Sequence, residues 1–67
     1  MLKISLNGAE QRIKPSTSVA ALLAENGYAD RRVAVEINHE IVPKSAHVQR
    51  LLHDGDNVEI VHALGGG

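Results

Sequence analysis

Apolar and polar residues alternate at the start of the chain in a way that predicts a β-hairpin. Residues 2–6 have the period of two that is typical of a half-buried strand. Asn7 and Gly8 follow at once, and both tolerate the positive φ angles of a two-residue hairpin turn. We therefore expect an antiparallel second strand over about 11–14 with Ile13 facing inward. Pro15 ends that strand because proline has no backbone N–H to donate.

The next segment has the period of a short helix. Val19, Leu22 and Leu23 are three and four residues apart, so they share one side of a helix. Ser18, or failing that the threonine before it, is the expected N-cap, and Gly27 is the expected C-terminal stop. A helix of about two turns is not stable alone, so it must pack on the strands.

The second half of the chain predicts three more strands. Residues 33–37 alternate again, and a turn at Asn38 and His39 leads into a short strand over 40–42. After a tight turn at 54–56, the last strand covers 57–62. This order predicts an α+β fold: a mixed, twisted sheet of four to five strands with one main helix packed on one face.

Between the fourth and last strands the pattern is mixed. We expect Val48, Leu51 and Leu52 to cover the core through a helical turn somewhere in 44–53.

The chain ends in Ala-Leu-Gly-Gly-Gly, which differs in composition from everything before it. Glycine has no Cβ, so three in a row gain little from being ordered and pass through narrow gaps. We therefore divide the chain into a folded domain, residues 1–62, and a flexible glycine-rich tail, residues 63–67.

Composition excludes several classes of function. The 67 residues carry a net charge of −1 without a basic stripe, and Tyr28 is the only aromatic residue, so a nucleic-acid partner is not expected. No apolar run approaches the roughly 20 residues of a membrane span, and no signal-peptide pattern is present, so we expect a cytoplasmic protein. A chain this short has little room for a deep substrate pocket, which argues against a free-standing enzyme.

Metal binding is not expected either. The chain has no cysteine, and its four histidines do not form a His-x-x-x-His pair, so we interpret them as scattered surface residues: His39, His47, His53 and His62.

Two stretches of the second half resemble a known family. Residues 35–43 (Val-Glu-Ile-Asn-His-Glu-Ile-Val-Pro) and 52–61 (Leu-His-Asp-Gly-Asp-Asn-Val-Glu-Ile-Val), followed by a glycine-rich end, resemble the ThiS family. These are ubiquitin-like β-grasp sulfur carriers of thiamine thiazole synthesis, and the resemblance covers nearly the whole chain. The family's terminal Gly-Gly pair maps onto Gly66 and Gly67, so Gly65 is an extra glycine.

The resemblance implies a mechanism in which the chain is a protein co-substrate without catalytic residues or a bound cofactor. An E1-like (ThiF-like) adenylating enzyme uses ATP to join AMP to the Gly67 carboxylate. A sulfur-transfer enzyme then supplies sulfur, and the resulting thiocarboxylate serves a thiazole synthase (ThiG-like). Gly65 and Gly66 would give the tail access to these active sites. Because the chain has no thiol, the acyl carbon is the only place where it would carry sulfur.

Strand alternation also suggests where partner enzymes dock. If Val58 and Ile60 face the helix, then Glu59 and Val61 lie on the opposite face of the sheet. Together with Leu64, they would form a small docking surface with an apolar centre.

Three other functions share these features. A sulfur carrier for molybdopterin synthesis has the same fold and tail, and a ubiquitin-like modifier joined to lysines also begins with an adenylate. The third alternative is a plain protein-binding module whose tail has no role.

Overall fold

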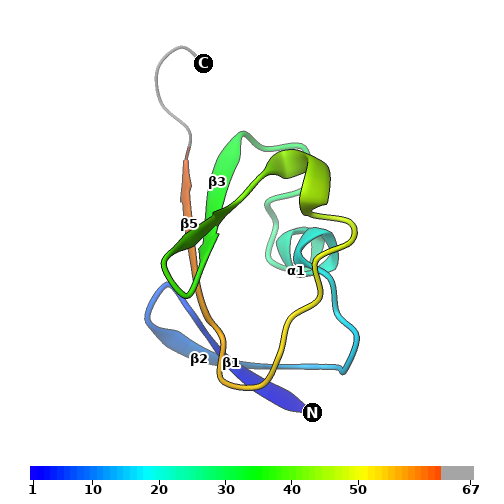
Figure 1. The fold of residues 1–67 in the computed structure, drawn as a ribbon, viewed down its shortest axis with the longest axis vertical. Helices are drawn as coiled ribbons and strands as arrows, with labels where there is room; N and C mark the ends of the chain where they lie inside the picture. The colour runs from blue at the N-terminus through cyan, green and yellow to red at the C-terminus, as the bar shows by residue number, and fades with distance from the viewer. Residues whose placement is uncertain (63–67) are drawn as a thin grey trace.

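The computed structural model describes residues 1–62 of the chain. Its elements are β1 (Leu2–Leu6), β2 (Ala9–Ile13), α1 (Val19–Glu25), β3 (Val33–Ile37), β4 (Glu40–Val42), the 3-10 helix η1 (Lys44–Ala46) and β5 (Asn57–His62). The strands of this part of the chain form one sheet in the order β2-β1-β5-β3-β4. Helix α1 lies across one face of it (Figure 1). The predicted α+β class is therefore confirmed.

The opening hairpin has the predicted turn. Asn7 and Gly8 both have positive φ, 50° and 87°, which suits the right-handed twist of the two strands. A two-residue turn places Ala9 directly opposite Leu6, so pairing begins at once. Strand β2 therefore starts two residues before the predicted position. The alternation rule missed this because Ala9 lies on a strand at the edge of the sheet and is exposed.

Helix α1 is capped as predicted. The Ser18 hydroxyl oxygen accepts a hydrogen bond from the Ala21 N–H at 3.0 Å. Gly27 follows the helix with a φ of 83°, which a residue with a side chain rarely adopts. Val19, Leu22 and Leu23 are buried against the sheet, so tertiary packing stabilises a helix that is only seven residues long.

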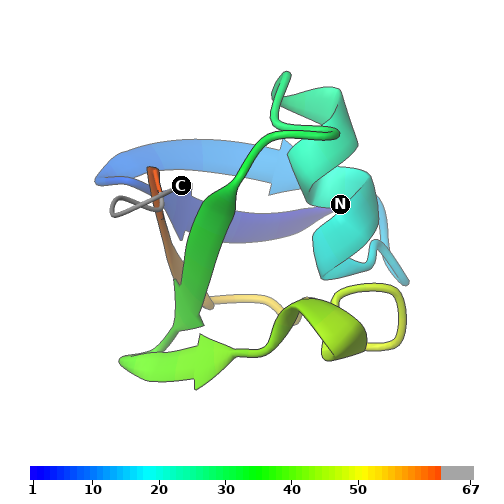
Figure 2. The same ribbon diagram turned by 90° about the horizontal axis from the view of Figure 1, so that it is seen from above.

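Strand β5 lies in the middle of the sheet. It runs parallel to β1 through the pairs Ser5–Asn57 and Leu6–Val58, and antiparallel to β3 from Ile37–Val58 to Val33–His62. The sheet is thus mixed, as predicted, and its strands twist relative to one another when seen from above (Figure 2).

The core lies between the sheet and α1. Its buried apolar side chains are Ile4, Ile13, Val19, Leu22, Leu23, Val35, Ile37, Val42, Leu52, Val58 and Ile60. Val58 and Ile60 therefore face α1, which fixes the direction of every side chain on β5.

The prediction for residues 44–53 is wrong for two of three residues. Val48 is 75% exposed and Leu51 is 42% exposed, whereas Leu52 is buried. The helical turn comes earlier than these residues, at η1, and Leu51 forms an isolated antiparallel bridge with Ser18. Adjacent residues of an extended segment point to opposite sides, so only Leu52 reaches the core.

The prediction that His47 lies on the surface is also wrong, because its side chain is buried. Its Nε2 lies 3.1 Å from the carbonyl oxygen of Val42 and its backbone carbonyl accepts a hydrogen bond from the Ala20 N–H. The side chain and backbone of His47 thus link η1 to both β4 and α1. The other three histidines are exposed, as predicted.

Candidate functional site

Strand β5 leads into the glycine-rich tail, and a polar network holds its first residues. The buried Asp56 carboxylate accepts hydrogen bonds from the His53 N–H at 2.8 Å and from the Asn38 side-chain amide at 3.0 Å. Asn38 in turn accepts a hydrogen bond from the Asn57 N–H at 2.9 Å and donates its own N–H to the Asn57 carbonyl at 2.8 Å. The start of β5 is therefore fixed by side chains as well as by strand pairing.

Asn7 fixes the middle of the strand. Its N–H donates to the Val58 carbonyl at 2.9 Å, and its side-chain oxygen accepts a hydrogen bond from the Ile60 N–H at 2.7 Å. Strand β1 ends at Leu6, so this side chain continues the pairing where the strand stops. From sequence, Asn7 is predicted only as a turn residue, because a hydrogen bond to a residue 53 positions away leaves no local signal.

The end of β5 has fewer fixed neighbours. Val61 and His62 pair with Ala34 and Val33 of β3. On the helix side, the Tyr28 and His62 rings lie 6.1 Å apart between centroids, at an angle of 54°. These contacts hold the last described residue of the strand at one end of the sheet.

The face of the sheet opposite α1 carries the predicted docking residues Glu59 and Val61. Both are exposed, and the exposed fraction of Val61 is 60%. Their neighbours Val58 and Ile60 are buried on the other side. The predicted direction of these side chains is thus confirmed, while their role in docking stays a prediction.

Strand register adds three residues that sequence analysis missed on this face. Glu36 lies directly opposite Glu59, and Ala34 lies opposite Val61. Ile41 lies opposite Glu36 and is 73% exposed. The signal was present in the alternation of 33–37 and 40–42, but only the register shows that these side chains adjoin Glu59. We call Ala34, Glu36, Ile41, Glu59 and Val61 the docking face.

The docking face combines apolar side chains with two like charges. Glu36 and Glu59 are a cross-strand pair, and like charges directly opposite each other destabilise a sheet. Ile41 and Val61 are among the large apolar side chains most exposed in the described part of the chain. Such a surface suits a partner that offers cations and an apolar contact.

The remaining predicted site residues, Leu64, Gly65, Gly66 and Gly67, lie outside the described residues, as does the predicted tail 63–67. Within residues 1–62, no group of three or more His, Asp or Glu side chains is placed to hold a metal ion. In the same range, no helix has the length and hydropathy needed to cross a membrane.

Comparison with known proteins gives consistent matches. The model of the ThiS family matches residues 4–67. The chain is 38% identical over 65 residues to the sulfur carrier protein ThiS of Bacillus subtilis. This match covers 96% of this chain and 98% of that protein. It is also 50% identical over 66 residues to a thiazole synthase of Paramagnetospirillum magneticum. The chain spans only about a fifth of the length of that synthase and of the related one from Magnetococcus marinus.

The fold matches a solved structure over almost the whole length of this chain. The crystal structure of the thiamine biosynthesis protein ThiS from Geobacter metallireducens superposes with a TM-score of 0.85 at 30% sequence identity. The match covers 98% of this chain and 100% of that one. The predicted β-grasp fold is thereby confirmed.

Proposed function

This chain belongs to the ThiS family, and we propose on that premise that it is a sulfur carrier of thiamine biosynthesis. The observation that carries the proposal is its match to the Bacillus sulfur carrier over almost the full length of both chains. The glycine-rich end lies within the segment that the family model matches.

The proposed chemistry takes place on the terminal carboxylate of Gly67. A carboxylate is a poor acyl donor because its oxygen is a poor leaving group. Attack on ATP by this carboxylate releases pyrophosphate and gives an acyl adenylate, from which AMP leaves when hydrosulfide, made available by the sulfur donor, attacks the acyl carbon and loses its proton. The product is a thiocarboxylate, and the chain has no cysteine that offers another place for the sulfur. ATP is a substrate of the adenylating enzyme in this scheme and not a cofactor of the chain.

The geometry of β5 supports this role. The strand is held at its start by Asp56 and Asn38 and at its middle by Asn7. Beyond His62 the sequence has five more residues, which span at most about 17–18 Å when fully extended. An enzyme that reacts with Gly67 must therefore contact the end of the sheet where β5 finishes.

We place that contact on the docking face. A few well-packed side chains near the centre of an interface contribute most of its binding energy, and Val61 and Ile41 are exposed apolar side chains that a partner could cover. Arginine or lysine residues of the partner would relieve the repulsion between Glu36 and Glu59. Leu64, the third predicted docking residue, remains part of this proposal.

Two partner enzymes follow from the proposal. One is a thiazole synthase, and the support is that two thiazole synthases contain a segment similar to this chain, at 50% and 36% identity. The other is an E1-like adenylating enzyme, which the chemistry of Gly67 requires.

The experiment is a reconstitution with both enzymes, ATP and a sulfur donor. We expect the chain to support thiazole formation and the variant lacking Gly66 and Gly67 to support none. Activity with a molybdopterin synthase but not with the thiazole synthase would favour the molybdopterin alternative. A ladder of lysine adducts in cell extract would favour the modifier, and full activity of the truncated variant would leave a plain binding module.

A further inference from the structure

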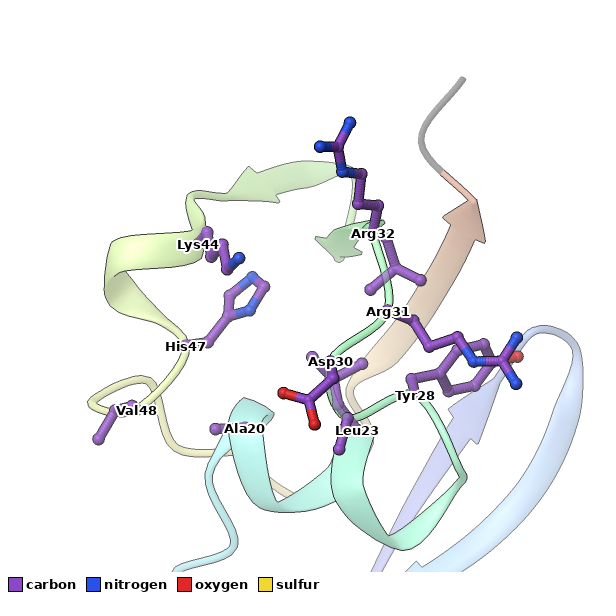
Figure 3. Close-up of a pocket in the computed structure, with 11 residues that line it drawn as sticks. Ala20, Leu23, Tyr28, Asp30, Arg31, Arg32, Lys44, His47 and Val48 are labelled. Atoms are coloured by element: carbon purple, nitrogen blue, oxygen red, sulfur yellow. The ribbon is translucent and has the colours of Figure 1, made fainter. Parts of the chain in front are cut away.

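A cavity of about 470 Å³ lies on the helix side of the molecule, away from the docking face. It opens between α1, the segment 28–33 and the residues of and after η1 (Figure 3). Its apolar lining comes from Ala20, Leu23, Tyr28, Ala29, Val33 and Val48. This volume is within the usual range of pockets that bind a small molecule or a few side chains.

The polar lining of the cavity is mostly cationic. Arg31, Arg32 and Lys44 line it beside a single carboxylate, Asp30, although the whole chain has a net charge of −1. Within residues 1–62, the ion pairs are Arg12 with Glu10 and His53 with Asp56, so these three cations have no carboxylate within 4 Å.

The side chains around the cavity are not equally placed to meet a ligand. Figure 3 shows Lys44 beside His47 on one side and Arg32 above the opening, whereas Arg31 extends away from the cavity, alongside Tyr28. The buried His47 is already held by the Val42 carbonyl. Arg32 and Lys44 are therefore the cations most available to an anionic group.

The cavity adjoins the end of β5. Val33 lines it and pairs with His62, the last described residue of the strand. Tyr28 also lines it, and its ring is the one that lies 6.1 Å from the His62 ring. The cavity and the docking face thus lie on opposite sides of the same end of the sheet. They have opposite charge, because Glu36 and Glu59 lie on the docking face.

We propose that this cavity is a second docking site, which receives an acidic segment of the partner enzyme that reacts with the tail. Carboxylates of that segment would pair with Arg32 and Lys44, and an adjacent apolar side chain would fill the space beside Leu23 and Val48. This inference rests on the proposed function, because the limited reach of the last five residues brings that enzyme to this end of the sheet.

The opposite charges of the docking face and the cavity would fix the orientation in which a partner binds. A partner that presents cations to Glu36 and Glu59 and carboxylates to Arg32 and Lys44 fits in one orientation only, since like charges repel in the reverse one. The cavity would therefore orient the carrier while the docking face supplies apolar contact.

The test compares two double variants that remove the same charge. Arg32→Ala with Lys44→Ala removes the two cations at the cavity. Lys3→Ala with Lys14→Ala removes two exposed cations near the start of β1 and the end of β2, at the other end of the sheet (Figure 1). Each variant and the unchanged chain are titrated calorimetrically against the adenylating enzyme and the thiazole synthase at two salt concentrations.

We expect the cavity variant to lose about tenfold or more in affinity for at least one enzyme, with a weaker salt dependence. The control variant should lose less than about twofold. Equal losses in both variants, or no loss in either, would overturn the proposal. The proposal would also be overturned if inorganic phosphate saturated the cavity in an NMR titration while the cavity variant kept normal partner affinity. The cavity would then be a site for small anions.

The same titration separates this inference from the proposed function. If the unchanged chain binds neither enzyme and is not adenylated, the proposed function fails and the inference fails with it. If the unchanged chain binds and is adenylated while the cavity variant behaves like the control, only the inference fails.

Discussion

The two ends of β5 are built in opposite ways. At its start, Asp56, Asn38 and Asn57 exchange hydrogen bonds in a partly buried network that also includes the His53 N–H. At its end, Val61 and His62 are exposed. One end of the strand is held by many contacts, and the other is open to a partner.

This difference indicates how one strand serves both folding and function. The contacts at the start and middle stabilise the sheet without using any residue of the docking face. The last described core residue in the sequence is Ile60. The end of the strand can therefore present the tail to a partner without disturbing the packing of the core. Substitutions at the start should therefore change stability, and substitutions from Val61 onward should change partner reactions.

The largest effect is expected at Gly67. Deleting this residue, or converting its carboxylate to an amide, should abolish adenylation because the reacting oxygen is removed. The melting temperature should not change, since glycine has no side chain that could be buried in the core. The measurement is ATP–pyrophosphate exchange with the adenylating enzyme; retained exchange would refute the role given to this carboxylate.

A second large effect is expected from Gly66→Val. A β-branched residue beside the reacting glycine restricts the backbone and adds bulk where the tail enters an active site. We expect the yield of thiocarboxylate to collapse while stability stays the same. Gly66→Ala is the matched control, which adds one methyl group and should reduce the yield less. Normal yield from the valine variant would show that access does not depend on glycine here.

A smaller effect is expected from Val61→Asp at the docking face. Removing an apolar anchor typically costs about 2 kcal/mol or more of binding energy, or roughly thirtyfold in affinity. Val61→Ala should lose less, because it adds no charge. Ser16→Asp changes the net charge equally at an exposed position between β2 and α1, which is not part of the docking face and does not line the cavity, and it should bind normally. Calorimetric titration checks this, and unchanged affinity for both Val61 variants would place the docking site elsewhere.

The smallest effect on partner reactions is expected from Asp56→Ala, at the fixed end of β5. The variant leaves the His53 N–H and the Asn38 amide without their acceptor, which should lower the free energy of unfolding by about 1.5–3 kcal/mol. Asp54→Ala is the control. The Asp54 carboxylate accepts a hydrogen bond from the Lys3 N–H, but this bond is exposed, so water can replace the carboxylate. Denaturant unfolding measures the difference. Equal stability of the two variants would mean that the network does not fix the strand.

Sequence patterns were sufficient for most of the fold. Alternation, the Asn7 and Gly8 turn, and the Ser18 cap each depend on residues close together in the chain, and the structure confirms all three. Local patterns failed where the decision depends on distant partners. Whether Val48 or Leu52 is buried is decided by the position of η1 and by the bridge between Leu51 and Ser18.

The residues of the candidate site also divide into those predictable from local sequence and those that depend on distant partners. Glu59 and Val61 follow from alternation within one strand, so their direction was predictable. Glu36 and Ile41 join them only through the register of β3 with β5 and β4. The cationic cavity combines residues from three separate segments, and its residues have no shared sequence pattern. The roles predicted for Gly65, Gly66 and Gly67 follow from the family resemblance, and these residues lie outside the described ones.

The most direct test of the central claim is the intact mass of the chain after incubation with the adenylating enzyme, ATP and a sulfur donor. The account predicts a rise equal to the difference between one sulfur and one oxygen atom, located on Gly67 by fragmentation and lost when thiazole synthase and its other substrates are added. An unchanged mass under conditions that support adenylation, or sulfur found on any other residue, would contradict it.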